Sequence, residues 1–198
     1  MVDFLSSHAL EILGVVLGLI YLLLEFKASW WMWVVGAVMP INSLFVYYKA
    51  GLYADFSIDI YYVLVGFYGL FMWLKGGVKK PSLPISRTPS KLWPLLAAIA
   101  LVLFVAIGLV LKNFTDSSVP WADSFTTALS IVALWMLARK WMEQWWVWFV
   151  VDAASTALYV YKGIYFYAGL YLLYTVLAVY GFYKWRKMLT LQGGQEIA

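Results

Sequence analysis

Two stretches of the chain decide its fold: WVVGAVMPINSLFVYYKAGLY at residues 33–53 and WWVWFVVDAASTALYVYKGIY at residues 145–165. They align without a gap, because residue 145 lies 112 positions after residue 33, and the same offset continues to residue 185. The identical pairs include Trp33 and Trp145, Ser43 and Ser155, Tyr47 and Tyr159, Gly51 and Gly163, Tyr53 and Tyr165, Tyr62 and Tyr174, Tyr68 and Tyr180, Gly69 and Gly181, and Trp73 and Trp185. An internal repeat in a membrane protein usually means two packed bundles with a substrate site between them. The repeat therefore predicts a transporter.

Composition indicates that the solvent of this chain is lipid. Hydrophobic residues make up 65% of the 198 positions, charged residues only 12%, and the mean hydropathy is +0.83. A soluble domain with so little charge would aggregate. The chain has no cysteine and one histidine, His8, so it lacks the paired haem ligands, thiolates and Ser-His pairs that membrane enzymes use. We expect no enzyme activity, no cofactor, no metal and no nucleic-acid partner.

Seven segments are apolar and long enough to cross a bilayer, which takes about 20 helical residues. They are residues 8–26, 30–50, 54–74, 92–111, 121–138, 145–162 and 164–185. A three-span unit ends on the side opposite to its start, so two parallel copies need one extra crossing between them. We predict an all-α membrane protein with a SWEET-like 3+1+3 layout. Its parts are a first three-helix bundle (8–75), a cytoplasmic loop (76–91), a linker helix (92–111), a second bundle (121–187) and a cytoplasmic tail (188–198).

Basic residues predict the orientation. In this layout eleven Lys and Arg residues fall on one side, and only Lys49, Lys112 and Lys162 fall on the other. The positive-inside rule then puts the N-terminus outside and the C-terminus in the cytoplasm of a bacterial cell, as a multi-pass protein of the inner membrane. Tryptophans near the predicted span ends would anchor the chain at the interfaces. They are Trp30, Trp31, Trp93, Trp121, Trp141 and Trp185.

The sixth span offers the clearest candidate site. Polar and aromatic residues recur there in steps of three and four and so share one helical face: Trp145, Trp148, Asp152, Ser155, Thr156 and Tyr159. Asp152 is seven residues in from Trp145, about 10 Å along the axis at about 1.5 Å per residue. An intramembrane carboxylate is costly and tends to face a cavity or a partner. Asp152 beside two indoles predicts a seat for a flat cationic or hydrogen-bonding aromatic molecule, and helix–helix pairing by Asp152 is the alternative.

The matching face of the second span carries Trp33, and Pro40 stands where the sixth span has Asp152. A proline in mid-membrane loosens the backbone, so Pro40 is a candidate hinge, with a static kink as the alternative. Asn42 is an intramembrane amide that needs a partner, and it is a candidate substrate contact.

The third and seventh spans carry equivalent polar stripes. Asp59 and Tyr62 occupy the positions of Tyr171 and Tyr174, and we predict all four at the site or its gate. No span holds a Lys or Arg near its centre, and no Gly-rich loop precedes a helix. A phosphorylated substrate would lack a counter-charge, so we expect a neutral or cationic one.

Several motifs resemble the Pnu-type vitamin transporter family, which includes PnuC-like nicotinamide riboside and PnuT-like thiamine transporters. They are WWMWVVG, KAGLYAD and YGLFMW in the first half, and WWVWFVVD, YKGIY and YGFYKW in the second. The resemblance covers about residues 8–187. Trp148 followed four places later by Asp152 looks like the family's Trp-x-x-x-Asn/Asp substrate motif. The first repeat departs from it, with Gly36 and Pro40 in those positions.

The resemblance implies uptake of an unphosphorylated B vitamin by facilitated diffusion with alternating access, followed by trapping through a cytoplasmic vitamin kinase. It also implies a homotrimer. The acidic and tryptophan-lined faces fit the cationic aromatics thiamine and nicotinamide riboside, with a slight lean to thiamine because of the carboxylate at Asp59. Riboflavin or sugar uniport ranks behind these, as does a vitamin-binding subunit of an ATP-driven transporter, since the repeated odd-span layout argues against that subunit class.

Overall fold

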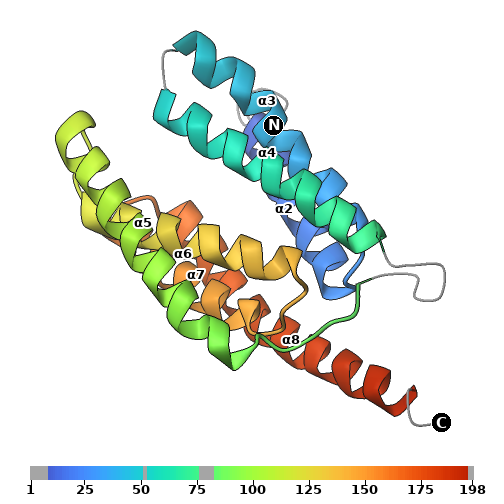
Figure 1. The fold of residues 1–198 in the computed structure, drawn as a ribbon. Helices are drawn as coiled ribbons and strands as arrows, with labels where there is room; N and C mark the ends of the chain where they lie inside the picture. The colour runs from blue at the N-terminus through green and yellow to red at the C-terminus, as the bar shows by residue number, and fades with distance from the viewer. Residues whose placement is uncertain (1–8, 51–52, 76–82, 196–198) are drawn as a thin grey trace. The chain divides into compact units, whose positions relative to one another are not determined.

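The computed structural model describes residues 9–50, 53–75 and 83–195, and helices dominate all three ranges. In chain order the α-helices of this described part are α2 (Ala9–Phe26), α3 (Trp31–Ala50), α4 (Tyr53–Leu74), α5 (Trp93–Phe114), α6 (Pro120–Ala138), α7 (Gln144–Tyr161) and α8 (Tyr165–Gln195), and the short helix η1 (Ser90–Leu92) precedes α5 (Figure 1). Each span predicted from hydropathy coincides with one of these α-helices. The largest difference is at α8, which continues ten residues past the predicted end at residue 185. His8, and the parts of the predicted loop and tail at 76–82 and 196–198, lie outside the described residues.

Length and apolar composition allow several helices to cross a bilayer. Among the residues that the structure describes, three stretches meet both conditions, Ser90–Phe114, Pro120–Ala138 and Tyr165–Gln192. Shorter apolar stretches lie within the first three helices, over Val15–Phe26, Trp31–Phe45 and Ile58–Leu74. This composition supports a chain that passes through a membrane more than once.

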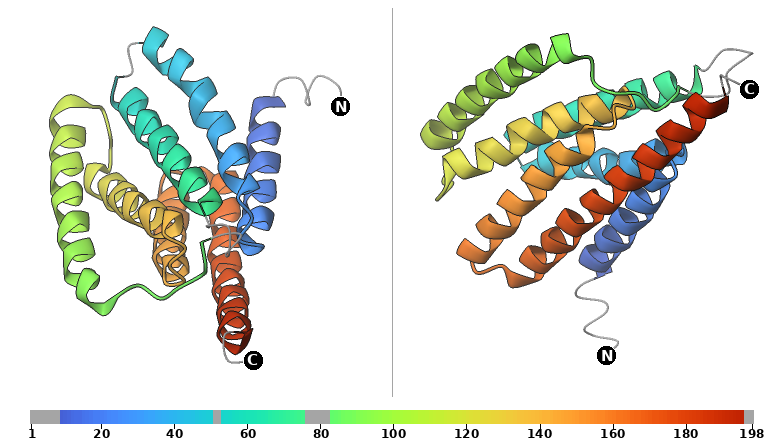
Figure 2. Two further views of the ribbon diagram at one scale, coloured as in Figure 1. Left: turned by 45° about the vertical axis from the view of Figure 1, so that its right-hand side comes forward. Right: turned by 90° about the horizontal axis from the view of Figure 1, so that it is seen from below.

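The chain forms two compact units, Met1–Leu83 and Pro84–Ala198. In the first unit α3 packs against both α2 and α4. In the second unit α5 packs on α6, α6 on α7 and α7 on α8 (Figure 2). The helix predicted as a linker therefore belongs to the same compact unit as the helices of the predicted second bundle.

Equivalent positions of the two repeats form the same helix end. Ala28 and Lys140, 112 residues apart, are the non-glycine residues of the described chain with positive φ, at 48° and 52°. After each, a backbone N–H closes a wide turn, from Ser29 to Leu24 O at 3.0 Å and from Trp141 to Met136 O at 3.0 Å. The N–H groups of Ala28 and Lys140 also donate to the carbonyls three residues earlier, both at 2.8 Å. These bonds make a Schellman motif, which satisfies the last helical carbonyls and turns the chain sharply.

A second shared feature is an indole packed on a glycine. In the first unit Trp33 meets the ring of Trp73 edge to face at 5.6 Å, and in the second Trp145 meets Trp185 at 5.7 Å. A Cβ added at Gly181 would lie 2.6 Å from the ring of Trp145, and Gly69 is pressed in the same way against Trp33. The glycines let the paired helices approach closely enough for the indoles to fill the space between them.

This packing corrects part of the sequence prediction for tryptophan. Trp185 is 0% exposed and Trp141 is 7% exposed, so both pack inside the second unit and do not anchor it at an interface. Trp31, Trp93 and Trp121 are exposed, as anchoring residues would be. An indole has one polar edge and is otherwise apolar, so it can pack inside a bundle or anchor a helix at the membrane interface. The position of a tryptophan along the sequence does not distinguish these two roles.

Replacement of Ala28 by glycine should stabilise the protein. The left-handed conformation costs an L-residue about 1–2 kcal/mol, and glycine removes this strain. Glycine also loses more conformational entropy on folding, which offsets about 0.5–1 kcal/mol of the gain. We expect a net gain of about 0.5–1 kcal/mol, measured as a rise of about 2 °C in the unfolding midpoint in detergent. Ala98→Gly, at an exposed interior position of α5, is the control and should lower the midpoint. A fall for Ala28→Gly would contradict the assigned turn.

Substitution Gly181→Ala should destabilise the second unit. The new methyl group would collide with the fully buried ring of Trp145, and overpacking of this kind costs about 1–3 kcal/mol. Gly169→Ala is the matched control in the same helix, because nothing lies within 4 Å of its added Cβ. Thermal unfolding followed by tryptophan fluorescence should separate the two variants, and equal midpoints would show that Trp145 can move aside.

Candidate substrate site

The polar face of α7 is buried within the second unit. Asp152 is 7% exposed, Ser155 is buried beside it on the next turn, and Trp148 is half-buried one turn before. The hydroxyl of Thr156 donates to the backbone oxygen of Asp152 at 2.8 Å, so it is satisfied within its own helix. The face therefore presents a carboxylate, a hydroxyl and an indole in successive turns.

Tyrosines from α8 complete the surroundings of Asp152. The carboxylate lies close enough to Tyr171 and Tyr174 to interact electrostatically with both. Tyr159 of α7 stacks on Tyr171 with ring centres 5.1 Å apart, the two side chains are hydrogen-bonded, and Tyr171 meets Tyr174 edge to face at 5.8 Å. The structure thus brings together Asp152, Tyr159, Tyr171 and Tyr174, which the sequence placed on two separate helical stripes.

This cluster has the chemistry to hold a flat polar ring. Tyrosine faces offer stacking surface, and their hydroxyls can donate to or accept from a ligand. A buried carboxylate attracts a cation or accepts a hydrogen bond from a ring N–H or amine. In the part of the chain that the structure describes, no three His, Cys, Asp or Glu side chains lie close enough to share a metal ion.

Trp145, the other predicted contact on α7, occupies a different environment. It is 1% exposed and is enclosed by Gly181 and Trp185. A ring in this position holds α7 against α8, and a direct contact with substrate would require the two helices to separate. Its role as a ligand contact stays a prediction.

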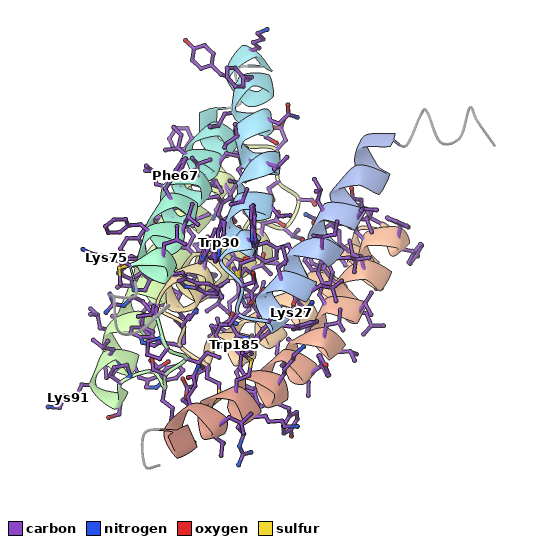
Figure 3. All side chains as sticks on the ribbon, turned by 90° about the vertical axis from the view of Figure 1, so that its right-hand side faces the viewer. Lys27, Trp30, Phe67, Lys75, Lys91 and Trp185 are labelled. Carbon is purple, nitrogen blue, oxygen red and sulfur yellow. The ribbon has the colours of Figure 1, made fainter. Side chains whose placement is uncertain are left out.

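The first unit contains a largely apolar cavity between α3 and α4. Its volume is about 510 Å³. The lining residues are Trp33, Val34, Ala37, Val38, Ile41, Asn42, Phe45, Gly66, Phe67 and Leu70. Two predicted site residues, Trp33 and Asn42, therefore line the same space. Figure 3 shows Phe67 projecting outward from α4, where its ring is 59% exposed.

The remaining predicted residues of the first unit, Asp59, Tyr62 and Pro40, are not among the residues that line this cavity. Asp59 is half-buried and interacts with Tyr62, three residues later on α4, and Tyr62 lies 5.8 Å from the ring of Tyr61. Helix α3 continues through Pro40 without a break, so the structure shows the residue inside a helix and leaves the hinge as a prediction.

Sequence reasoning missed four contacts in the second unit. Tyr167, in the first turn of α8, stacks on Tyr159 at 5.6 Å. Asp123, in the first turn of α6, pairs with Lys162 at 2.9 Å and accepts from the hydroxyl of Ser117 at 2.7 Å. Thr88 donates to Glu143 from a segment predicted as irregular loop. The partners in these contacts lie on different segments of the chain, whereas helical periodicity relates only residues of the same helix. The contacts could be predicted only by inferring which segments are neighbours.

Comparison with known proteins identifies the family. The model of the nicotinamide mononucleotide transporter family matches residues 8–187, which is nearly the whole chain. The chain belongs to this family, the Pnu-type vitamin transporters. The resemblance noted in the sequence is confirmed, and the family's characterised relatives are transporters and not enzymes.

Three relatives of this Pnu-type chain are named for two different substrates. The riboflavin/roseoflavin transporter RibM of Streptomyces davaonensis is 30% identical over 88% of the chain and 83% of its own length. The nicotinamide riboside transporter PnuC of Escherichia coli is 22% identical over 77% of the chain and 74% of its own length. The PnuC protein of Neisseria mucosa is 27% identical over 77% of the chain and 63% of its own length.

A solved structure supports the fold of the Pnu-type chain. The crystal structure of the vitamin B3 transporter PnuC superimposes with a TM-score of 0.72 and covers 95% of this chain and 85% of the other, at 23% identity. The match shows that this chain shares the all-helical fold of that structure. At 23% identity this superposition concerns the fold and not the substrate.

Proposed function

We propose that the protein carries an unphosphorylated, aromatic B vitamin across the membrane by alternating access. The observation that supports this most is the buried Asp152 beside Tyr171 and Tyr174, with Trp148 one turn away on α7. A charge is retained in an apolar bundle at considerable cost, and function is the common reason for keeping it. A planar ring with an N–H, an amine or a positive charge fits such a group.

Among the vitamins, riboflavin and nicotinamide riboside have support from named relatives. Identity to the riboflavin/roseoflavin transporter is 30%, against 22% and 27% to two nicotinamide riboside transporters. The isoalloxazine ring of riboflavin is flat and carries an N–H that can donate a hydrogen bond to a carboxylate. We therefore propose riboflavin first and nicotinamide riboside second. Thiamine, which the carboxylate at Asp59 favoured slightly, becomes the third substrate to test.

The family description names nicotinamide mononucleotide, which carries a phosphate. Lys49 and Lys112 lie in the last turns of α3 and α5, and the basic residues of α8 are Lys184, Arg186 and Lys187, ten or more residues after Tyr174. A phosphate at the depth of Asp152 would meet a negative charge without a positive partner. We propose that phosphorylated vitamins are excluded.

The other parts of the proposal follow from the repeat and the family. The two three-helix repeats, joined by α5, would alternate between an outward-open and an inward-open arrangement, with Pro40 as hinge. Transport would be facilitated diffusion, a cytoplasmic vitamin kinase would trap the product, and the working unit would be a homotrimer. The protein would lie in the inner membrane with its N-terminus outside.

Purified protein in liposomes tests the transport class. We expect counterflow of labelled riboflavin, nicotinamide riboside or thiamine without ATP, an ion gradient or a partner protein, and none of nicotinamide mononucleotide. Competition among the three vitamins in one preparation ranks them. No flux until an energy-coupling ATPase is added would contradict facilitated diffusion, and flux of the mononucleotide would contradict exclusion of phosphate.

Calorimetry on two variants tests the site. Asp152→Asn should weaken binding of the preferred vitamin about 10- to 100-fold, because a hydrogen bond to a charged group contributes about 1.5–3 kcal/mol. Trp148→Ala should weaken it roughly tenfold through lost stacking. Asp123→Asn is the matched control at the partly exposed end of α6 and should change affinity less than twofold. Unchanged affinity in both α7 variants, with the fold intact, would remove α7 from the site.

A further inference from the structure

Residues 84–89, here called the strap, lie along the turn between α6 and α7 (Figure 1). The N–H of Ser86 donates to the carbonyl of Lys140 at 3.0 Å, and the N–H of Met142 donates back to Ser86 O at 2.9 Å. With these two bonds the backbone of the strap pairs with the turn as a short parallel bridge. Ile85 is buried at the start of the strap, so the segment is packed as well as hydrogen-bonded.

A side-chain contact closes the other end of the strap. Thr88 donates to Oε2 of Glu143 twice, from its N–H at 2.7 Å and from its hydroxyl at 2.9 Å. Thr88 is buried and Glu143 is half-buried. Hydrogen bonds to a carboxylate are short and about twice as strong as neutral ones, particularly where solvent is partly excluded. The strap is therefore held at both ends.

The carboxylate exists in one repeat only. The turns at Ala28 and Lys140 have the same hydrogen bonds, but the position equivalent to Glu143 is Trp31. Trp31 is exposed and stacks on Trp30 at 4.1 Å, and an indole side chain offers no acceptor for the two bonds that Glu143 receives. The two turns thus share their backbone hydrogen bonds, but only the turn before α7 has a side-chain acceptor, the carboxylate of Glu143, at this position.

The strap acts on the helix that carries the proposed site. Glu143 is the N-cap of α7, and Asp152 follows nine residues later, about 13 Å along the axis. The chain reaches the strap directly after the boundary between the units at Leu83 and Pro84, before η1 and α5 begin. The first residues of the second unit, which form the strap, are therefore hydrogen-bonded to the start of α7 before the chain enters η1 and α5.

We infer that Thr88 and Glu143 are positioning residues, which hold α7 at the angle that presents Trp148 and Asp152 to the vitamin. This rests on the vitamin-binding site proposed above. A site residue fixed before binding loses less conformational freedom when the ligand arrives, so release of the strap weakens affinity although neither residue touches the ligand.

The test uses the full-length protein in detergent, with calorimetry of riboflavin, nicotinamide riboside and thiamine. Thr88→Val removes one hydrogen bond at almost constant shape, and Glu143→Ala removes both. We expect affinity for the preferred vitamin to fall three- to tenfold in each. The double variant should bind no more weakly than Glu143→Ala alone, because the two residues form one contact. Thr88→Ser keeps the hydroxyl and should restore wild-type affinity.

Thr190→Val is the matched control, because its hydroxyl bonds only to the backbone of Arg186 in the same helix. It should leave affinity unchanged. Hydrogen exchange over residues 139–148 provides a second readout, and the Met142 amide should exchange faster in Thr88→Val and Glu143→Ala. If Glu143→Ala does not fold, Glu143→Gln takes its place, since it removes the charge and keeps one acceptor.

The outcomes separate the two proposals. If wild-type protein binds none of the three vitamins, the proposed function fails and the positioning role fails with it. If the wild type binds and Thr88→Val binds equally well, only the positioning role is overturned. A loss of affinity that Thr88→Ser does not restore, or that Thr190→Val shares, would also overturn it, because either result would indicate general destabilisation.

Discussion

The packing of an indole against a glycine is the contact on which each unit depends. In lipid, apolar side chains gain little by leaving the solvent, so helices associate through close van der Waals contact. Trp145 fills the space above Gly181 and meets the edge of Trp185, and Trp33 does the same with Gly69 and Trp73. A buried ring of that size permits very few positions of the helix that carries it. In the second unit that helix is α7, so the contact also determines where Asp152 lies.

The two repeats share this scaffold and differ where chemistry is expected. Where the second has Trp148 and Asp152, the first has Gly36 and Pro40, and Asp59 stands in the place of Tyr171. The second unit consequently holds a carboxylate among tyrosines, and the first holds a cavity with one amide in its lining. The two copies have thus diverged in their polar side chains without a change of scaffold.

Polar contacts lie at both ends of α7 in the second unit. Lys140 is almost fully buried at the turn, and burial lowers its pKa to about 8, so it still holds its proton for the most part at pH 7. The turn around it is secured by backbone bonds from Ser86 and by the carboxylate of Glu143. At the other end of α7, Lys162 pairs with Asp123 of α6. Both ends of the α6–α7 pair are therefore tied by polar contacts outside the apolar middle.

The sequence by itself determined the helices, the repeat and the family, because hydropathy, periodicity and motif spacing are properties of consecutive residues. It also placed Trp148 and Asp152 on one face, since a helical face follows from steps of three and four. Only the tertiary structure decided that Asp152 meets Tyr171 and Tyr174, that Trp185 packs inside the unit, and that Thr88 reaches Glu143. Such contacts depend on which helices are neighbours and on their rotation, and these follow from how large side chains fit together across the bundle. Ala28 and Lys140 show the same limit, because neither is a glycine and their left-handed turns are set by the packing on either side.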